Sequence, residues 1–168
     1  GAADVRQLER YPRDTAGGIM TTQVTALYEY LTVDDANTLL RRLSQELEQM
    51  FYVYVIDRRR HLVGVLSMRD LILAVPTRRL RDMMIPSVRS VPATMDQEQV
   101  ARLMRRYGYL AMPVVDEQNR LIGLITVDDV VDVIEEEATE DVQRMFGAGA
   151  EERLSSPWQL SFRKRIWW

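Results

Sequence analysis

The 168-residue chain contains no cysteine and a single histidine. The absence of cysteine excludes disulfide bonds, thiolate metal sites and cysteine nucleophiles. The histidine, His61, ends the polar stretch Arg58-Arg59-Arg60-His61, which we interpret as a surface turn because a metal site needs several ligands together. A nucleophile–base pair and a glycine-rich phosphate loop are also missing, so the sequence argues against an enzyme.

Long apolar runs and a strong charge of one sign are missing as well. No apolar stretch approaches the roughly 20 residues that a membrane-spanning helix needs. The formal net charge is −3, which argues against nucleic acid as a partner. Hydrophobic residues make up 46% of the chain and charged residues 28%, a composition that predicts a folded protein with a real core.

What the chain does contain is a repeat. Residues 53–72 (VYVIDRRRHLVGVLSMRDLI) match residues 112–131 (MPVVDEQNRLIGLITVDDVV) at an offset of 59. A duplicated unit is stronger evidence than a single motif, because chance would have to succeed twice at one offset. The repeat therefore predicts two similar halves.

Each copy predicts the element order β-α-β-β-α, which gives an α/β protein. Helix start signals with Thr or Asp side chains, which can accept from free N–H groups, occur at 32–35 and 94–98. Apolar residues recur after them at helical spacing. The full assignment has β-rich stretches at 24–31 and 88–93, strands at 51–56, 62–67, 112–115 and 121–126, and closing helices at 68–75 and from 127 into an acidic tract.

The segments GVLSMRD at 64–70 and GLITVDD at 123–129 carry a resemblance to a known family. Residues 19–135 resemble a pair of CBS domains, which implies two repeats packed with pseudo-two-fold symmetry. In that family the hydroxyl and carboxylate of the Ser/Thr-x-x-Asp motif hold an adenine nucleotide. The resemblance thereby implies these nucleotide-binding residues: Tyr52 and Tyr109 for the base, Arg69 for phosphate, and Ser67, Asp70 and Thr126 for the ribose side.

An alternative reading of these motifs stays open. Ser/Thr-x-x-Asp is also an ordinary helix cap with an acid in the first turn, and aromatic residues at strand entrances commonly belong to a core. The second motif, at 126–129, has no basic residue beside it and would repel phosphate. We therefore expect nucleotide binding in the first half rather than the second.

The acidic tract 128–141 (DDVVDVIEEEATED) has eight carboxylates and no base. Like charges four residues apart destabilise a helix, so this helix either lies bare in water or binds cations. Carboxylates without His or Cys suit Mg²⁺ or Ca²⁺. The sequence leaves both possibilities open.

A sharper resemblance covers residues 11–20 and 127–141, which are similar to the cytosolic region of MgtE-type magnesium channels. It implies the end of a preceding helical domain at 1–18, CBS domains at 19–80 and 81–138, and a long connecting (plug) helix at 139–168 that leads to the membrane. The segment Arg163-Lys164-Arg165-Ile166-Trp167-Trp168 has the composition of a cytoplasmic membrane boundary. The family's Mg²⁺-sensing positions match as acids at Asp96, Glu98, Asp129, Asp132, Glu137, Glu140 and Asp141, whereas Gly108 replaces an acid that the family often has.

This resemblance implies a homodimeric regulatory module on the cytoplasmic face of the cell membrane. Its partners would be its own N-terminal domain and the transmembrane pore domain, and its ligands Mg²⁺ and ATP or another adenine nucleotide. The alternatives are a CBS pair that senses only adenine nucleotides for another protein, and a dimerisation scaffold whose acids are simply solvated.

Overall fold

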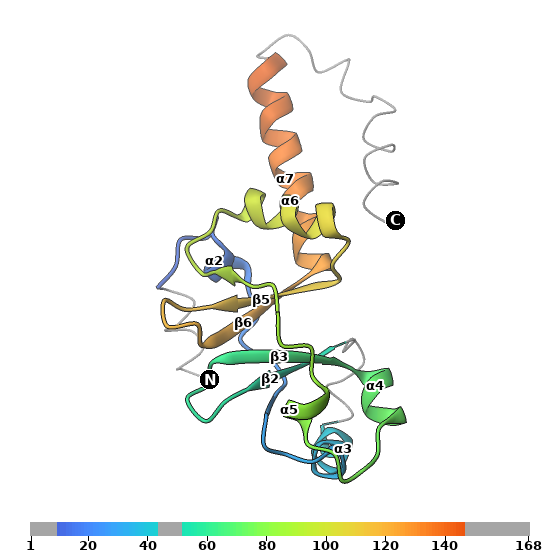
Figure 1. Cartoon of the computed structure of the whole chain (residues 1–168). Helices are drawn as coiled ribbons and strands as arrows, with labels where there is room; N and C mark the ends of the chain where they lie inside the picture. Colours follow the sequence, from blue (N-terminus) through green and yellow to red (C-terminus); the bar gives the residue numbers. More distant parts are fainter. Residues whose placement is uncertain (1–9, 44–51, 147–168) are drawn as a thin grey trace.

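The computed structural model describes residues 10–43 and 52–146, and within these ranges the chain forms two three-stranded sheets with helices around them (Figure 1). The first half contains β1 (Ala26–Tyr28), α3 (Val33–Arg42), β2 (Tyr52–Ile56), β3 (Leu62–Ser67) and α4 (Met68–Leu73). The second contains β4 (Val91–Pro92), α6 (Gln97–Tyr107), β5 (Ala111–Val115), β6 (Leu121–Thr126) and α7 (Val127–Phe146). Short helices α2 (Ala16–Ile19) and α5 (Leu80–Met83) precede the halves. The predicted α/β fold of two similar halves is confirmed.

The two sheets repeat each other residue by residue. In each, the first strand runs parallel to the central strand, and the central strand pairs antiparallel with the third. Tyr52 pairs with Ser67, and the equivalent Ala111 pairs with Thr126. Both hairpins have a register irregularity at the same place, between residues 55 and 56 and between 114 and 115. The sequence repeat is therefore a repeat of backbone geometry.

Several predicted boundaries were wrong by a few residues. Helix α4 ends at Leu73 instead of Val75, because Val75 precedes Pro76 and proline disfavours a helical residue before it. The start of helix α6 agrees with the signal predicted at 94–98: the helix begins at Gln97 and is capped by Asp96, whose carboxylate accepts from the Glu98 N–H at 3.1 Å. The β-rich stretches reduce to Ala26–Tyr28 and Val91–Pro92. Three predictions extend to residues outside the described ones: the preceding domain at 1–9, the strand start at 51 and the membrane-proximal connection at 147–168.

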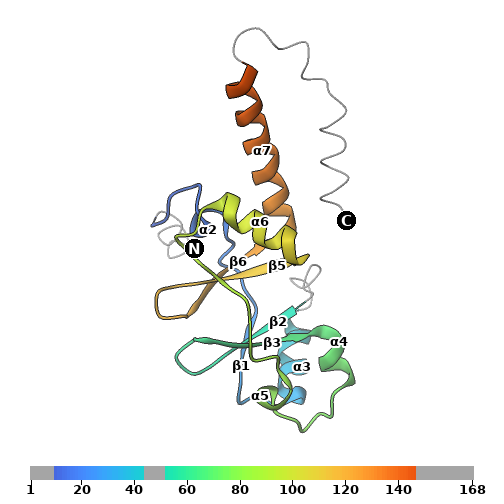
Figure 2. The same cartoon turned by 45° about the horizontal axis from the view of Figure 1, so that its top comes forward.

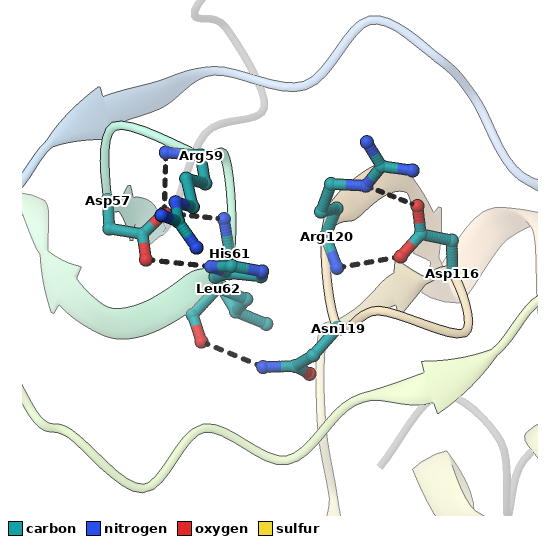
Figure 3. A network of polar contacts seen from close by, with 7 residues as sticks. All are labelled: Asp57, Arg59, His61, Leu62, Asp116, Asn119 and Arg120. Atoms are coloured by element: carbon teal, nitrogen blue, oxygen red, sulfur yellow. Dashed lines mark hydrogen bonds and ion pairs between the residues drawn. The ribbon is translucent and has the colours of Figure 1, made fainter.

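The hairpin turns of the two halves lie against each other (Figure 3). The Leu62 N–H donates to the Asn119 carbonyl at 3.0 Å, and the equivalent Leu121 N–H donates to the Arg60 carbonyl at 3.1 Å. Arg60 and Asn119 both have positive φ, 69° and 62°, which lets each carbonyl reach the other turn. This reciprocal pair of hydrogen bonds joins the halves at one end.

Aspartates organise both turns (Figure 3). Asp57 Oδ1 accepts from the backbone of Arg59 and His61, each at 2.9 Å, and its Oδ2 lies 2.8 Å from His61 Nδ1. Asp116 Oδ1 accepts in the same way from Gln118 and Arg120. His61 is thus a turn residue, as expected from its polar surroundings.

The segment that precedes each half packs on the opposite half. Ala16 of α2 is fully buried in the core of the second half, the cluster that also contains Val100, and the Gln97 N–H donates to the Asp14 carbonyl at 2.8 Å. In the same way Leu80 of α5 is buried in the core of the first half. Figures 1 and 2 both place α2 beside the second half and α5 beside the first. Each half is therefore completed by chain that lies outside its own repeat.

Helix α7 closes the second half and continues beyond it. Val130, Val133 and Val142 are buried, while the helix rises away from the sheets in both views (Figures 1 and 2). It is continuous from Val127 to Phe146, through the expected boundary at 138. No helix within the described ranges is long and apolar enough to cross a membrane.

Candidate functional site: a cavity between the halves

A cavity of about 1130 Å³ lies between the two halves. Its size is that of a site for a small organic ligand. Most of its lining is apolar. Among the described lining residues, the polar side chains are threonines, tyrosines, one glutamine, one cation and one carboxylate. The lining comprises residues 21–28, Leu31, Leu39, Leu43, Tyr52 and Tyr54 from the first half, and Met104, Arg105, residues 108–111, Leu124, residues 126–128, Val130, Val131 and Ile134 from the second.

Both tyrosines proposed for base stacking line this cavity. Tyr52 begins strand β2 and is 39% exposed, and Tyr109, which precedes β5, is 36% exposed. Tyr109 stacks on Tyr107 with ring centroids 5.7 Å apart, and the Arg89 guanidinium lies 4.0 Å from the Tyr107 centroid. This stack holds Tyr109 while leaving part of its surface open to a ligand.

Gly108 directs the chain from α6 to Tyr109. It ends the helix in the left-handed conformation, with φ 66° and its N–H donating to the Met104 carbonyl. A residue with a Cβ is strained in this conformation, so glycine is the natural choice at this turn. Gly108 itself lines the cavity, which makes the helix end part of the site.

The two Ser/Thr-x-x-Asp motifs have different geometries. The Ser67 hydroxyl accepts from the Asp70 N–H at 3.0 Å, which is an ordinary helix cap. In the second motif the Asp129 carboxylate turns back and accepts from both the N–H and the hydroxyl of Thr126, each at 3.0 Å. Thr126 lines the cavity, whereas Ser67, Arg69 and Asp70 do not. The cavity thus lies at the second motif, although the sequence favoured the first for ligand binding.

Sequence reasoning missed several cavity residues. The segment 21–25 precedes strand β1 and had no ligand-binding motif to identify it. Tyr54 was read only as part of a strand, yet it lines the cavity and is 4% exposed. Burial raises the pKa of its phenol, and neighbouring Tyr52 raises it further, so the hydroxyl stays protonated. Alternation along β2 could have placed Tyr54 on a buried face, but not in a cavity.

The acids proposed for Mg²⁺ are distributed over two helices. Asp96 caps α6, and Glu98 forms an ion pair with Arg102 at 2.8 Å. Asp129 is partly buried against Thr126, and Asp132 is exposed on α7. Glu137, Glu140 and Asp141 lie on α7, outside the residues whose side chains the structure describes. Among the side chains that are described, no three His, Cys, Asp or Glu residues form a group that could hold a metal ion.

The carboxylates nevertheless fit the chemistry of Mg²⁺ in one respect. This ion prefers oxygen ligands, keeps several of its waters and is commonly bound through one or two carboxylates. An exposed acid such as Asp132 meets that requirement, whereas a cage made of the described side chains of one chain is not present.

Comparisons with known proteins agree with this architecture. The CBS domain family matches residues 16–77 and 80–136. The magnesium transporter MgtE of Thermus thermophilus is 48% identical over 143 residues, which cover 85% of this chain and 32% of that protein. The magnesium transporter MgtE of Bacillus subtilis is 41% identical over 164 residues, covering 98% of this chain and 36% of the relative.

A solved structure is similar as well. The cytosolic domain of the Mg²⁺ channel MgtE in complex with ATP superposes with a TM-score of 0.74 at 48% identity, covering 78% of this chain and 53% of that one. The chain spans about a third of the length of the two curated relatives, both of which are transporters rather than enzymes.

Proposed function

Since the chain belongs to the CBS domain family and is homologous to the cytosolic region of MgtE magnesium transporters, we propose that it is the regulatory module of a magnesium channel. In this proposal the module senses Mg²⁺ at the cytoplasmic face of the membrane and controls the pore. It acts as a homodimer, together with the channel's own N-terminal and transmembrane domains. An adenine nucleotide bound in the cavity tunes the response.

The observation that carries the proposal is the course of α7. One continuous helix begins at the cavity motif, contributes to the core of the second half through Val130, and carries acids at 128–141 out beyond the sheets. Neighbouring like charges on a helix repel, at a cost of about 0.2–0.5 kcal/mol per pair. The position of such a helix is therefore sensitive to the positive charge around it.

The chain's carboxylates supply the sensing. Mg²⁺ held by these acids would supply positive charge and so let acids of neighbouring segments approach. The proposed set is Asp96, Glu98, Asp129, Asp132, Glu137, Glu140 and Asp141. Because the described acids of one chain do not gather into a cage, we place the sites between α7, α6 and acids of the partner subunit or the N-terminal domain.

The gate follows from this electrostatic balance. With few cations present, the acids hold α7 and its neighbours apart. When cations are abundant, the compact arrangement is favoured, and the connecting helix proposed at 139–168 holds the pore shut. A ligand shifts such an equilibrium only by binding one state more tightly, so several weak sites acting together suit a millimolar sensor.

A melting and scattering experiment tests the proposal. The thermal midpoint and radius of gyration of the chain are followed from zero to tens of millimolar MgCl₂, against NaCl of equal ionic strength. We expect Mg²⁺ to raise the midpoint and reduce the radius beyond the effect of NaCl. Asp129→Asn with Asp132→Asn should weaken this response, because asparagine keeps an acceptor for Thr126 but removes the charge.

A control variant removes the same number of carboxylate charges elsewhere in the chain. Glu117→Gln with Asp82→Asn removes two exposed acids far from the proposed sites in sequence, and should leave the Mg²⁺ response intact. A response to MgCl₂ equal to that to NaCl, or one that survives in the Asp129/Asp132 variant, would contradict the sensing role.

A second candidate function is supported by the cavity. Its size, its apolar lining and the two tyrosines suit an adenine nucleotide, and the similar MgtE structure was solved with ATP. A module that senses only nucleotide would bind ATP in calorimetry and show no Mg²⁺-specific compaction. For the combined function we expect both.

A further inference from the structure

Tyr54 is a buried tyrosine whose hydroxyl has no hydrogen-bond partner among the residues that the structure describes. The residue is 4% exposed, lies in the middle of β2 and lines the cavity between the halves. No hydrogen bond joins its side chain to any of the residues that the structure describes, 10–43 and 52–146. Buried hydroxyls normally have a partner, since an unsatisfied one destabilises the fold.

The fold does not require a hydroxyl at this position. Tyr54 pairs with Ala26 on one side and Val65 on the other, and it packs among apolar residues such as Ile56 and Leu62. The equivalent residue of the second half is Pro113, which pairs with Leu124 in the same register. The second half thus forms the same strand without a polar side chain at this position. Tyr54 and Pro113 occupy the same place in the sheet, but only Tyr54 carries a hydroxyl.

The space beside Tyr54 has a definite chemical character. Across the described lining, Arg105 is the one cation and Asp128 the one acid, and the remaining polar side chains of the first half are neutral: those of Thr21, Thr22, Gln23, Thr25 and the tyrosines. Such a lining gives phosphate little electrostatic support, whereas apolar walls with a few hydrogen-bonding groups suit a neutral heteroaromatic ring. Because burial keeps the Tyr54 phenol protonated, its hydroxyl can both donate and accept across the physiological pH range.

We infer that Tyr54 is a specificity-determining residue, whose hydroxyl faces the cavity and hydrogen-bonds the heterocyclic base of the bound nucleotide. The inference rests on the nucleotide-binding part of the proposed function. It assigns Tyr54 to the base and not to the phosphates. Stacking on Tyr52 or Tyr109 tolerates any aromatic ring, so a directional hydrogen bond is what would distinguish one base from another.

Calorimetric titration with ATP and with adenosine tests this role on the 168-residue chain. Tyr54→Phe removes one oxygen and keeps the ring, and we expect affinity for both ligands to fall by the same factor, about three- to tenfold, as for loss of one neutral hydrogen bond. The melting temperature of the ligand-free variant should be unchanged or higher, because the hydroxyl has no hydrogen bond to lose within the part of the chain that the structure describes. Tyr30→Phe is the matched control, since Tyr30 is 36% exposed and outside the cavity lining.

Each other outcome has a clear reading. Equal affinities of wild type and Tyr54→Phe would overturn the inference while leaving nucleotide binding intact. A loss confined to ATP would place the contact at phosphate and overturn the assignment to the base. If wild type bound neither ligand, this inference and the nucleotide part of the proposed function would both fail, and the Mg²⁺ experiment would still decide the sensing part separately.

Discussion

Met84 packs directly on the backbone of Gly64, so closely that a Cβ added to Gly64 would overlap its Sδ, Cγ and Cβ atoms. Gly123 and Met20 have the same relationship in the second half. Each methionine comes from the segment that precedes a repeat and crosses to the other half. The glycine of each repeated motif therefore makes room for a methionine that belongs to the segment before the other repeat. This packing explains why both copies of the motif have glycine at this position.

Replacing either glycine should destabilise the fold. Gly64→Ala or Gly123→Ala would push the methionine away from the sheet, and overpacking of this kind costs about 1–3 kcal/mol. A lower midpoint in urea unfolding, with an unchanged slope, would show the loss. The double variant Gly64→Ala with Met84→Ala makes room for the new methyl group and should be less unstable than the sum of its two single changes. Urea midpoints equal to wild type for both glycine variants would contradict the packing.

Acid should weaken the junction between the two turns. Partial burial alone would raise the pKa of Asp57, but hydrogen bonds from His61 and Arg59 outweigh it and lower the pKa below its ordinary value. The pKa of Asp116 is lowered in the same way, with hydrogen bonds from Arg120 and Gln118 outweighing burial. A carboxyl with a lowered folded pKa stabilises the fold above its ordinary pKa, and this contribution is lost as pH falls.

The measurement is the free energy of unfolding between about pH 5 and pH 2, the interval in which such carboxyls take up protons. Asp57→Asn with Asp116→Asn cannot titrate, so its stability should fall less steeply over this interval than that of wild type. Asp82→Asn, at an exposed position outside the turns, should keep the wild-type slope. Parallel curves for wild type and the turn variant would show that these hydrogen bonds do not govern acid stability.

Gly108 should tolerate asparagine better than alanine. A Cβ there meets no atom, but φ is 66°, and alanine in this left-handed conformation costs about 1–2 kcal/mol. Asparagine adopts the conformation more readily, so Gly108→Asn should retain more of the melting temperature than Gly108→Ala. The reverse order would mean that space rather than backbone strain limits this position.

Tyr109 should contribute to nucleotide affinity through stacking. Loss of an aromatic ring that stacks on a base weakens binding by about 1–3 kcal/mol. We therefore expect Tyr109→Ala to weaken ATP and adenosine binding at least fivefold in calorimetry, and Tyr109→Phe to bind nearly as well as wild type. Tyr28→Ala, which removes a cavity tyrosine that stacks on Tyr30 instead, distinguishes general loosening of the site from loss of the base contact. Full affinity in Tyr109→Ala would remove this residue from the site.

Much of the fold could be read from the repeat, because the hairpins and their flanking helices depend on neighbours a few residues away. The Thr32 cap is one example: its hydroxyl accepts from the Asp35 N–H at 3.1 Å, and both residues stand within one helical turn. The site was predicted less well. Tyr52, Tyr109 and Thr126 do line the cavity, but Tyr54 and the segment 21–25 had no local signal.

The sequence by itself determined the two-fold repetition, the identity of the strands and helices, and the charge that α7 carries, since these follow from the order of side chains along the chain. Only the tertiary structure decided that α2 and α5 exchange between the halves, that the cavity opens at Thr126 rather than at Ser67, and that the Tyr54 hydroxyl is left without a protein partner among the described residues. The reason is physical. Burial, and the packing of α2 and α5 on the opposite halves, depend on which distant segments of the chain meet. The two Ser/Thr-x-x-Asp motifs are too alike in sequence to show which of them lies at the cavity.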